Sequence, residues 1–556
     1  MNKKVCSFPI LFALLTLLIG TCAVVFPASA QAAPTSTGSI TVSGTVASSY
    51  DAYQIFSANV VDGDSDAKIA TDLAWASDAA RDAVLPVLHS AGMPNSKTTA
   101  REAAEWLNTD SHLTSALSAQ LARSLQSSGA ASVALNAGTT AELPCGYWLI
   151  VADDDAIAQG EAGTAPIMAL VGGTAVTVKP KAATPKVAKH VLEDSTAAWQ
   201  KAADATVADD LYWRLSATVP AGLTAYDTYT VRFVDTMSAG LDLSKVAASM
   251  RVYVAAGADG GFDAVSAGKD GRAGTEPVKG WTDITAQCAT KVAADGKTFT
   301  VRTGDLIAAL GGADAFTAGA RVVAVYNAPL SSACNHGIAK GNPNEVYLRY
   351  PRSPLVDQSG DAGFTRTPSD DACAYTWDLA LTKRGSDGDK PLAGAVLSIA
   401  DDRGRTLAAD GTWDTKGKAT VTTGEDGRVT VSGTDSGKLE VRELKAPKGY
   451  TAFKGTRSVT AKAEGLDVDQ VAAAKPKLTI TAESPLRADS ADGSTGSLEA
   501  SLINTPTGTP PSITTGGFMP STGDMAMYAA AAAAVAGAAL IVVALLVKRG
   551  GGSHKE

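Results

Sequence analysis

The segment "VTVKPKAATPKVAKHV", residues 176–191, lies between two strand-like runs and contains four lysines. In an extended strand, side chains two residues apart point to the same face. Lys189 therefore shares a face with Val187 and Val191, although a lysine is rarely buried without a partner. Lys181 differs, because the proline before it removes a backbone donor and favours an accessible segment. The pattern predicts a strand-rich fold with one buried lysine and one exposed lysine.

Polar residues occupy the apolar face of five further strand-like runs. They are Lys383 in "LALTK", Asp235 in "YTVRFVD", Glu443 in "LEVRE", Asn344 in "NEVYLRY" and Asn504 in "LEASLIN". Two adjacent regions thus each contain a lysine near the first strand, an acid midway and an asparagine near the last strand. Single polar residues at strand ends often reach solvent. The repeated order makes that explanation less attractive, because burying three unpaired polar groups costs on the order of several kcal/mol.

A lysine, a carboxylic acid and an asparagine held together can form an amide bond with loss of ammonia. Desolvation lowers the pKa of a lysine and so favours the neutral, nucleophilic amine. The same surroundings raise the pKa of the acid, which in its protonated form polarises the asparagine carbonyl by donating a hydrogen bond. Rigid strands make the step unimolecular. The pattern therefore predicts one single-turnover internal cross-link in each region, without a cofactor.

Both ends of the chain carry membrane-targeting patterns. Basic residues and the apolar run Val5–Phe26 precede small residues that fit cleavage after Ala30 or Ala32. This predicts a secretory signal peptide over residues 1–32, with a retained N-terminal anchor as the alternative. Near the other end, the apolar residues 525–547 are followed by a basic pair, which predicts a transmembrane segment with a cytoplasmic tail.

Composition limits the classes of partner. The net charge is −9 without a basic block, which argues against nucleic acid. Four cysteines follow the signal peptide, and Cys288 with Cys334 is the favoured disulfide because both fall in one predicted domain. The sequence leaves open whether Cys145 pairs with Cys373. No CxxC motif occurs and the five histidines are scattered, so no metal site is predicted.

The 556 residues suit about three domains. Strand patterns in 39–61 and alanine-rich amphipathic stretches at Ala67–Ser90 and Thr98–Ser127 predict an α+β first domain. Short alternating strands between Gly- and Asp-rich turns then predict β-sandwiches. The predicted order is a signal peptide at 1–32, an N-terminal domain at 33–183, β-sandwiches at 184–376 and 377–506, a Thr/Pro/Gly linker at 507–518 and a terminal segment at 519–556.

The stretch "FMPSTGD", residues 518–524, stands directly before the apolar segment and the basic tail. This order resembles a cell-wall sorting signal of Gram-positive surface proteins, usually written LPxTG, with Met519 in place of the leucine. The resemblance implies that a sortase cleaves between Thr522 and Gly523 and joins Thr522 to an amine. It also implies a transient membrane anchor and final attachment to peptidoglycan.

Nearly the whole chain resembles a sortase-assembled backbone pilin, or major fimbrial subunit, of Gram-positive bacteria. "ITVSGT" and "LPCGYWLIV" are similar to the N-terminal pilin domain. "TPKVAKHV", "FVDTMSAGL" and "GNPNEVYLRYPRSP" are similar to the fimbrial isopeptide-forming D2 domain, and "RELKAPKGY" matches the E-box of a Cna B-type, SpaA-like domain. The resemblance implies a mainly β protein with tandem Ig-like, Cna B-type sandwiches after an α+β domain.

The resemblance also implies particular cross-linked residues. The pairs are Lys189 with Asn344, assisted by Asp235, and Lys383 with Asn504, assisted by Glu443. Each bond would tie a first strand to a last strand. Asp227, Asp242 and Glu345 lie close enough in sequence to remain alternatives to Asp235.

The accessible lysine has a counterpart in the same family. The pilin motif of the family ends in Tyr-Pro-Lys, and this chain has Lys179-Pro180-Lys181, without the upstream tryptophan. By resemblance, Lys181 accepts Thr522 of the next subunit. Lys179 and Lys186 remain competitors, and an ordinary solvated lysine is the other interpretation.

These observations predict a wall-anchored shaft subunit of a covalent surface pilus that supports adhesion, rather than a turnover enzyme. Head-to-tail joining is a heterologous contact and builds an open filament. The expected partners are a sortase, neighbouring subunits, peptidoglycan and a host or partner-cell ligand. The alternatives are a wall-anchored monomeric adhesin and a surface hydrolase that uses the acids as general acid and base. The apolar neighbours of Asp235 and Glu443 argue against the hydrolase.

Overall fold

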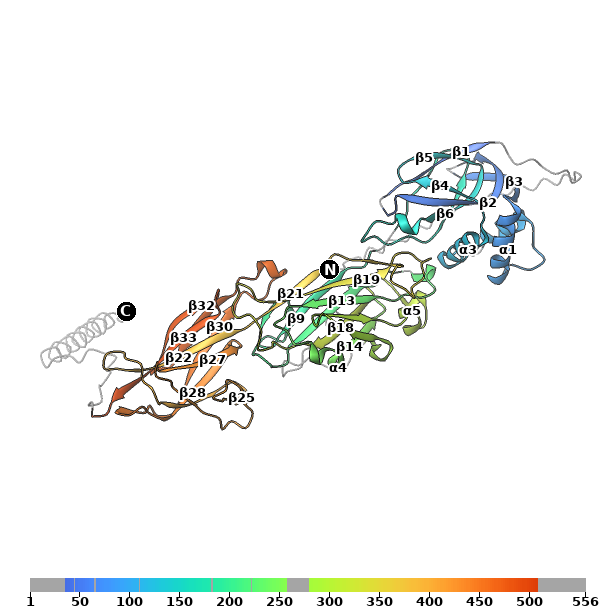
Figure 1. Cartoon of the computed structure of the whole chain (residues 1–556). Coiled ribbons are helices and arrows are strands. Elements are labelled where there is room, and N and C mark those ends of the chain that lie inside the picture. The colour runs from blue at the N-terminus through green and yellow to red at the C-terminus, as the bar shows by residue number, and fades with distance from the viewer. Residues whose placement is uncertain are drawn as a thin grey trace, which may run out of the picture.

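Three modules follow one another along an elongated, mainly β chain (Figure 1). The computed structural model describes residues 36–508 except 45, 65–66, 110, 182–183, 222 and 258–279. The predicted signal peptide, the Thr522–Gly523 cleavage site and the apolar segment 525–547 lie outside the described residues. Within the described part, no helix is both long and apolar enough to cross a membrane.

The N-terminal module combines two sheets with three helices. One sheet has the order β5 (Thr140–Pro144), β1 (Thr37–Val42), β8 (Val176–Val178). The other has the order β3 (Lys68–Trp75), β2 (Ser49–Asp62), β6 (Gly146–Ala152), β7 (Ile167–Val171), with β4 (Ser132–Asn136) paired to β2. The helices are α1 (Asp78–Ser90), α2 (Ala100–Leu107) and α3 (Ser115–Ser128). The predicted α+β arrangement is confirmed.

The helix expected over Ala67–Ser90 begins later than predicted. Its first half is the strand β3, which pairs antiparallel with β2. The helix starts only after Ser77, whose side chain accepts a hydrogen bond from the amide of Ala80 and so satisfies a free donor of the first turn. The alanines made the whole stretch resemble one helix, but pairing with β2 determined the structure of the first half.

The middle module is a sandwich of two sheets that enclose its core. One sheet has the order β10 (Ala198–Gln200), β9 (Val187–Glu193), β12 (Tyr212–Thr218), β18 (Arg321–Asn327), β14 (Arg251–Ala255), β15 (Trp281–Asp283). The second has the order β11 (Ala202–Asp204), β21 (Asp370–Tyr375), β19 (Asn342–Pro351), β13 (Arg232–Met237), β17 (Thr298–Arg302), β16 (Ala289–Val292), with β20 (Phe364–Arg366) paired to β19. Residues two apart on β13 and β19 face the core, as the alternating burial of both strands shows.

The third module is also built from two sheets around a core of its own. One has the order β27 (Arg428–Thr434), β22 (Trp377–Gly385), β33 (Ser497–Pro506), β29 (Tyr450–Thr451), with β32 (Leu486–Asp492) paired to β33. The other has the order β25 (Trp413–Asp414), β24 (Thr406–Leu407), β23 (Val396–Ala400), β28 (Gly437–Lys445), β30 (Thr456–Glu464), β31 (Lys477–Ala482), with β26 (Val421–Thr422) paired to β23. Its first strand, β22, and its last, β33, are parallel neighbours.

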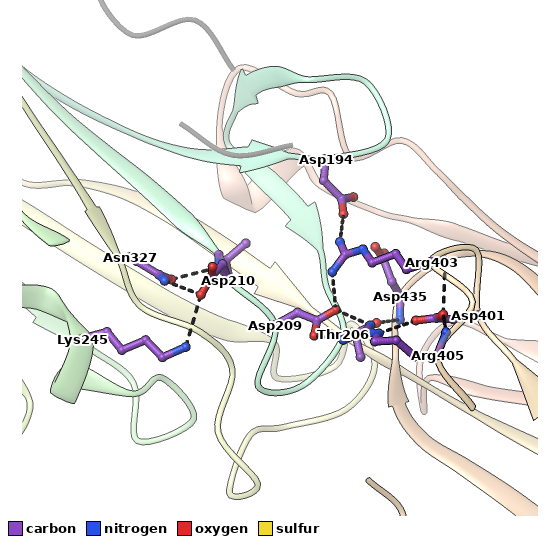
Figure 2. A network of polar contacts seen from close by, with 11 residues as sticks. Asp194, Thr206, Asp209, Asp210, Lys245, Asn327, Asp401, Arg403, Arg405 and Asp435 are labelled. Carbon is purple, nitrogen blue, oxygen red and sulfur yellow. Dashed lines mark hydrogen bonds and ion pairs between the residues drawn. The ribbon is translucent and has the colours of Figure 1, made fainter. Parts of the chain in front are cut away.

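Charged side chains connect the middle and third modules (Figure 2). Asp209 of the middle module accepts hydrogen bonds from both Arg405 terminal nitrogens, at 2.6 and 2.7 Å, and from Arg403 at 2.8 Å. Arg403 also reaches Asp194, at 3.2 Å. Paired Arg–carboxylate bonds fix orientation as well as distance. The two sandwiches are therefore held in a defined relative orientation.

The predicted Cys288–Cys334 disulfide is absent, because all four cysteines of the described chain are free thiols. The Cys288 thiol donates to the carbonyl of Ile284, at 3.3 Å. Cys334 closes a separate turn, in which its amide donates to the carbonyl of Ser331. Each cysteine packs against the core from its own loop. Membership of one domain was too weak a criterion, and this prediction is wrong.

Candidate cross-linking sites and linking lysine

The middle module buries its predicted lysine, acid and asparagine completely. Lys189 lies on β9 of one sheet, whereas Asp235 and Asn344 lie on the paired strands β13 and β19 of the opposite sheet. All three are 0% exposed. Met237 pairs with Asn344 in the register of these strands, so Asp235 and Asn344 are diagonal neighbours on the core face.

A fourth residue, Tyr326 of β18, lies at the centre of this cluster and is also 0% exposed. The Lys189 ammonium forms an ion pair with Asp235 and donates to the Tyr326 hydroxyl, at 3.0 Å. The Asn344 amide nitrogen donates to the same hydroxyl, at 2.9 Å. The hydroxyl in turn donates to Asp235 Oδ2, at 3.1 Å. The structure therefore brings the three predicted residues together around a tyrosine.

Sequence patterns did not single out Tyr326. Its strand reads "RVVAVYN", in which Tyr326 follows Val322 and Ala324 on the core face. An aromatic residue on an apolar face is the ordinary content of a sandwich core. The only signal was a hydroxyl group on that face, and a buried tyrosine hydroxyl usually requires a partner.

Two buried oxygens of the middle site have no hydrogen-bond partner, Asp235 Oδ1 and Asn344 Oδ1. A protonated Asp235 would carry a donor, and the carbonyl oxygen of Asn344 is an acceptor on the same face. Unpaired buried polar atoms are costly, so a native core that retains them usually has a reason. Proton donation from Asp235 to the Asn344 carbonyl would satisfy both atoms and polarise the carbonyl.

Burial changes the ionisation of the middle pair. Desolvation lowers the pKa of Lys189 to about 8, although the neighbouring Asp235 charge opposes the shift. Desolvation also raises the pKa of Asp235, against the opposing effect of Lys189. Both shifts favour the form of the pair in which a neutral amine lies beside a neutral acid over the form with two charges.

The third module contains a second cluster with a more direct geometry. Lys383 of β22 contacts Asn504 Oδ1 on the neighbouring strand β33. Glu443, from β28 of the opposite sheet, has its Oε1 atom 3.3 Å from Lys383 Nζ and accepts from Asn504 Nδ2 at 2.8 Å. The exposed fractions of Lys383, Asn504 and Glu443 are 0, 2 and 7%. Desolvation lowers the pKa of Lys383 to about 8.

The alternatives to Asp235 lie elsewhere. Asp227 forms a surface ion pair with Arg123, at 2.9 Å, and its side chain is 70% exposed. Asp242 accepts a hydrogen bond from the amide of Ser244 in a local turn. Glu345 is exposed on the outer face of β19. Of these acids, the structure places Asp235 alone beside Lys189.

The strands that the two clusters connect are not equivalent. Lys383 and Asn504 lie on the first and last strands of the third module, as predicted. Asn344 instead lies on β19, and β20 and β21 follow it before the module ends. The prediction of a first-to-last connection is therefore wrong for the middle module. The sequence placed Asn344 on a late strand but did not show that two further strands, β20 and β21, follow it and pair with β19.

The three candidate linking lysines lie between β8 and β9. Lys179, Lys181 and Lys186 are all exposed, and residues 182–183 between them lie outside the described part. Thr184 donates to Glu161 of the N-terminal module, at 3.3 Å, so the segment runs along the junction of the first two modules. All three lysines are thus accessible, and their exposure does not show which of them is the linking lysine.

The pH dependence of cross-link formation in the middle module would show whether Asp235 takes part. An attack that needs a neutral amine and a protonated acid proceeds only while the Lys189–Asp235 pair retains one proton. Because the pKa of Lys189 is lowered to about 8 and that of Asp235 is raised, we expect the rate of Lys189–Asn344 bond formation to fall about tenfold per pH unit above about pH 8. Rates that instead rise to an alkaline plateau would show that deprotonation of the amine is sufficient. Intact mass against time, on freshly folded chain at several pH values, measures this.

Comparison with known proteins matches one module to a family. Residues 378–475 match the model of SpaA, a prealbumin-like fold domain. The trypsin-resistant surface T6 protein of Streptococcus pyogenes serotype M6 is 30% identical over 130 residues, which are 22% of this chain and 22% of that protein. The matched region thus spans about a fifth of the curated relative.

Two solved structures resemble larger parts of the chain. The T6 backbone pilin of S. pyogenes serotype M6 has 16% identity and a TM-score of 0.45, with 85% of this chain and 98% of that chain covered. The major pilin SpaA of Corynebacterium diphtheriae, whose structure is described as pointing to a modular pilus assembly and stabilizing isopeptide bonds, has 14% identity and a TM-score of 0.38, with coverages of 84% and 99%. Residues 378–475, within the third module, are thus matched by the SpaA prealbumin-like family.

Proposed function

We propose that the chain is the shaft subunit of a covalent pilus, exported to the cell surface and joined head to tail by a sortase. Thr522 of one subunit would form an amide with Lys181 of the next, and the last subunit would be attached to peptidoglycan. The observation that carries the proposal is the pair of buried lysine–acid–asparagine clusters in consecutive sandwiches. A shaft bears tension along its length, and internal amide bonds resist it.

Each cluster brings together the three groups that an internal amide requires. In the proposed reaction the neutral lysine amine attacks the side-chain carbonyl carbon of the asparagine, a protonated acid would stabilise the developing negative charge on the carbonyl oxygen, and ammonia leaves. Both clusters are excluded from solvent, which favours the neutral amine and disfavours hydrolysis. The reaction occurs once per site, so the chain acts as its own substrate.

The internal bonds are tested by the mass of the chain after folding. We expect the intact mass to be lower than the calculated mass by two ammonia molecules. Asn344→Ala should restore one of them and Asn504→Ala the other, because each substitution removes one electrophile. In the middle module, loss of water instead of ammonia would identify an amide between Lys189 and Asp235. An unmodified mass would contradict the self-linking scheme.

A wall-anchored monomeric adhesin is the second candidate, because a sorting-type C-terminus and rigid sandwiches would suit it as well. The exposed lysine segment between the first two modules favours the polymer. Cell-wall extracts boiled in detergent should show a ladder spaced by one subunit mass if the chain forms a shaft. A single band would support the adhesin.

A further inference from the structure

The Tyr326 hydroxyl joins the two nitrogen atoms between which the proposed reaction moves protons. It accepts from Lys189 Nζ, the attacking nitrogen, at 3.0 Å and from Asn344 Nδ2, the leaving nitrogen, at 2.9 Å. Its own hydrogen points to Asp235 Oδ2, at 3.1 Å. No hydrogen bond links Lys189 to Asn344 directly among the contacts of the described residues. The hydroxyl is therefore the shared contact of nucleophile and leaving group.

The third module fills the same place with a carboxylate. Glu443 Oε1 lies 3.3 Å from Lys383 Nζ and 2.8 Å from Asn504 Nδ2, so one oxygen again contacts both nitrogens. Asp235 is one methylene shorter than glutamate. In the middle module Asp235 contacts the lysine, and Asn344 Nδ2 donates to Tyr326 instead. An aspartate with a tyrosine thus occupies the position that a glutamate fills alone in the third module.

We propose that Tyr326 is a catalytic residue of the middle module, whose hydroxyl relays a proton from the attacking Lys189 nitrogen to the departing Asn344 nitrogen. The inference rests on the internal cross-link of the proposed function and adds a residue to it. When Nζ bonds to the Asn344 carbonyl carbon, the nitrogen must lose a proton. Nδ2 must gain one before the C–N bond breaks and ammonia leaves.

The relay balances without another reactant. Once Nζ has bonded to the carbonyl carbon, Nδ2 is no longer conjugated with the carbonyl and has a free lone pair. Nζ then gives a proton to the Tyr326 oxygen while the hydroxyl hydrogen turns from Asp235 to Nδ2 and is transferred, so the tyrosine is unchanged at the end. Asp235 gives its proton to the carbonyl oxygen during attack and recovers it when the carbonyl forms again. The products are one Lys189–Asn344 amide and one ammonia.

Two features suit Tyr326 to this role. Burial raises the pKa of its phenol well above the ordinary value, so the hydroxyl stays protonated before and after the proton transfer. The ring is held in place by Phe299, whose centroid lies 4.9 Å away in an edge-to-face contact. The strand that carries it, β18, lies inside its sheet between β12 and β14. The hydroxyl is therefore fixed relative to both nitrogens.

The test replaces Tyr326 by phenylalanine in the full chain and measures both cross-links in the same molecule. Peptide mapping at times after synthesis is stopped gives the fractions of Lys189–Asn344 and Lys383–Asn504 linked peptides. We expect Tyr326→Phe to slow the first by about a hundredfold or more, the usual contribution of a proton-transfer group, and to leave the second unchanged. Tyr350→Phe is the matched control, because Tyr350 is also 0% exposed in this module and its hydroxyl donates to Gly160, away from the site.

Rescue by a longer acid separates a relay from a packing role. Asp235→Glu added to Tyr326→Phe should restore the middle cross-link, because it recreates the arrangement of the third module. A loss of packing would not be repaired by lengthening the acid. A double variant that folds, as shown by its intact third-module cross-link and unfolding midpoint, but lacks the middle bond would contradict the relay.

The outcomes separate this inference from the proposed function. A wild-type chain without the middle cross-link would overturn the proposed chemistry itself. A wild-type chain that forms the Lys189–Asn344 bond, and a Tyr326→Phe chain that forms it at the same rate, would overturn only the relay. A wild-type bond between Lys189 and Asp235 would also overturn the relay, because no nitrogen then leaves.

Discussion

Lys181→Ala should abolish the covalent polymer, leaving a single subunit band where the wild type gives a ladder in boiled detergent extracts. The amine of Lys181 is the acceptor that the proposed transfer of Thr522 requires, and an alanine offers no nucleophile. Lys181 is exposed in a segment that follows β8 after a proline, so its removal disturbs no buried contact. We therefore expect normal folding and both internal cross-links, which the intact mass reports.

The neighbouring lysines supply matched controls for this experiment. Lys179→Ala and Lys186→Ala remove the same charge from the same exposed segment and should leave the ladder intact. A ladder that survives Lys181→Ala but disappears with one of the other two would move the linkage to that lysine. A ladder that survives all three substitutions would contradict the linkage through this segment.

Strand alternation predicted the residues of both clusters because burial on a pleated strand has a strict period of two. Lys189, Lys383 and Asn504 stand out in such a pattern, since a charged or amide group interrupts an apolar face. The structure places each of them in the core. The pairing of Lys383 with Asn504, which the resemblance implied, agrees with the structure, because the two residues lie on neighbouring first and last strands of one sandwich.

Other features depend on contacts that no local pattern encodes. Tyr326 looked like core packing, because the group that matters is one hydroxyl on an aromatic ring. The position of Asn344 two strands before the end of its module depends on how the chain returns to the sheet. The strand β3 resembled a helix until its pairing with β2 was known. Each of these depends on tertiary partners that lie far away in sequence.

The load path of the proposed shaft explains where the clusters occur. Tension that enters a subunit at Lys181 and leaves at Thr522 passes through the middle and third modules and bypasses the N-terminal module. The middle and third modules, which would bear this tension, are the two modules that contain the clusters. Among the described residues of the N-terminal module, no lysine, acid or asparagine is buried. Internal amide bonds would thus be placed where force acts.

The same path predicts how far each module extends. With Lys383 bonded to Asn504, almost the whole third module is bypassed, because the two residues lie near its ends. With Lys189 bonded to Asn344, residues 190–343 are bypassed, but the chain after Asn344 remains free to extend. That chain includes the end of β19, together with β20 and β21. Under tension, the middle module should therefore extend in part, and the third module should extend very little.

Asn344→Ala should turn the partial extension of the middle module into a complete one. A fully extended chain spans about 3.3–3.6 Å per residue, so residues 345–376 release on the order of 100 Å and residues 184–376 on the order of 600 Å. Force spectroscopy on single chains pulled from Lys181 and the C-terminus measures the difference. Because loop closure stabilises a fold by about 5 kcal/mol for loops of this length, the variant should also unfold at lower temperature. A wild-type middle module that extends by the full length would show that no covalent bond joins its two sheets.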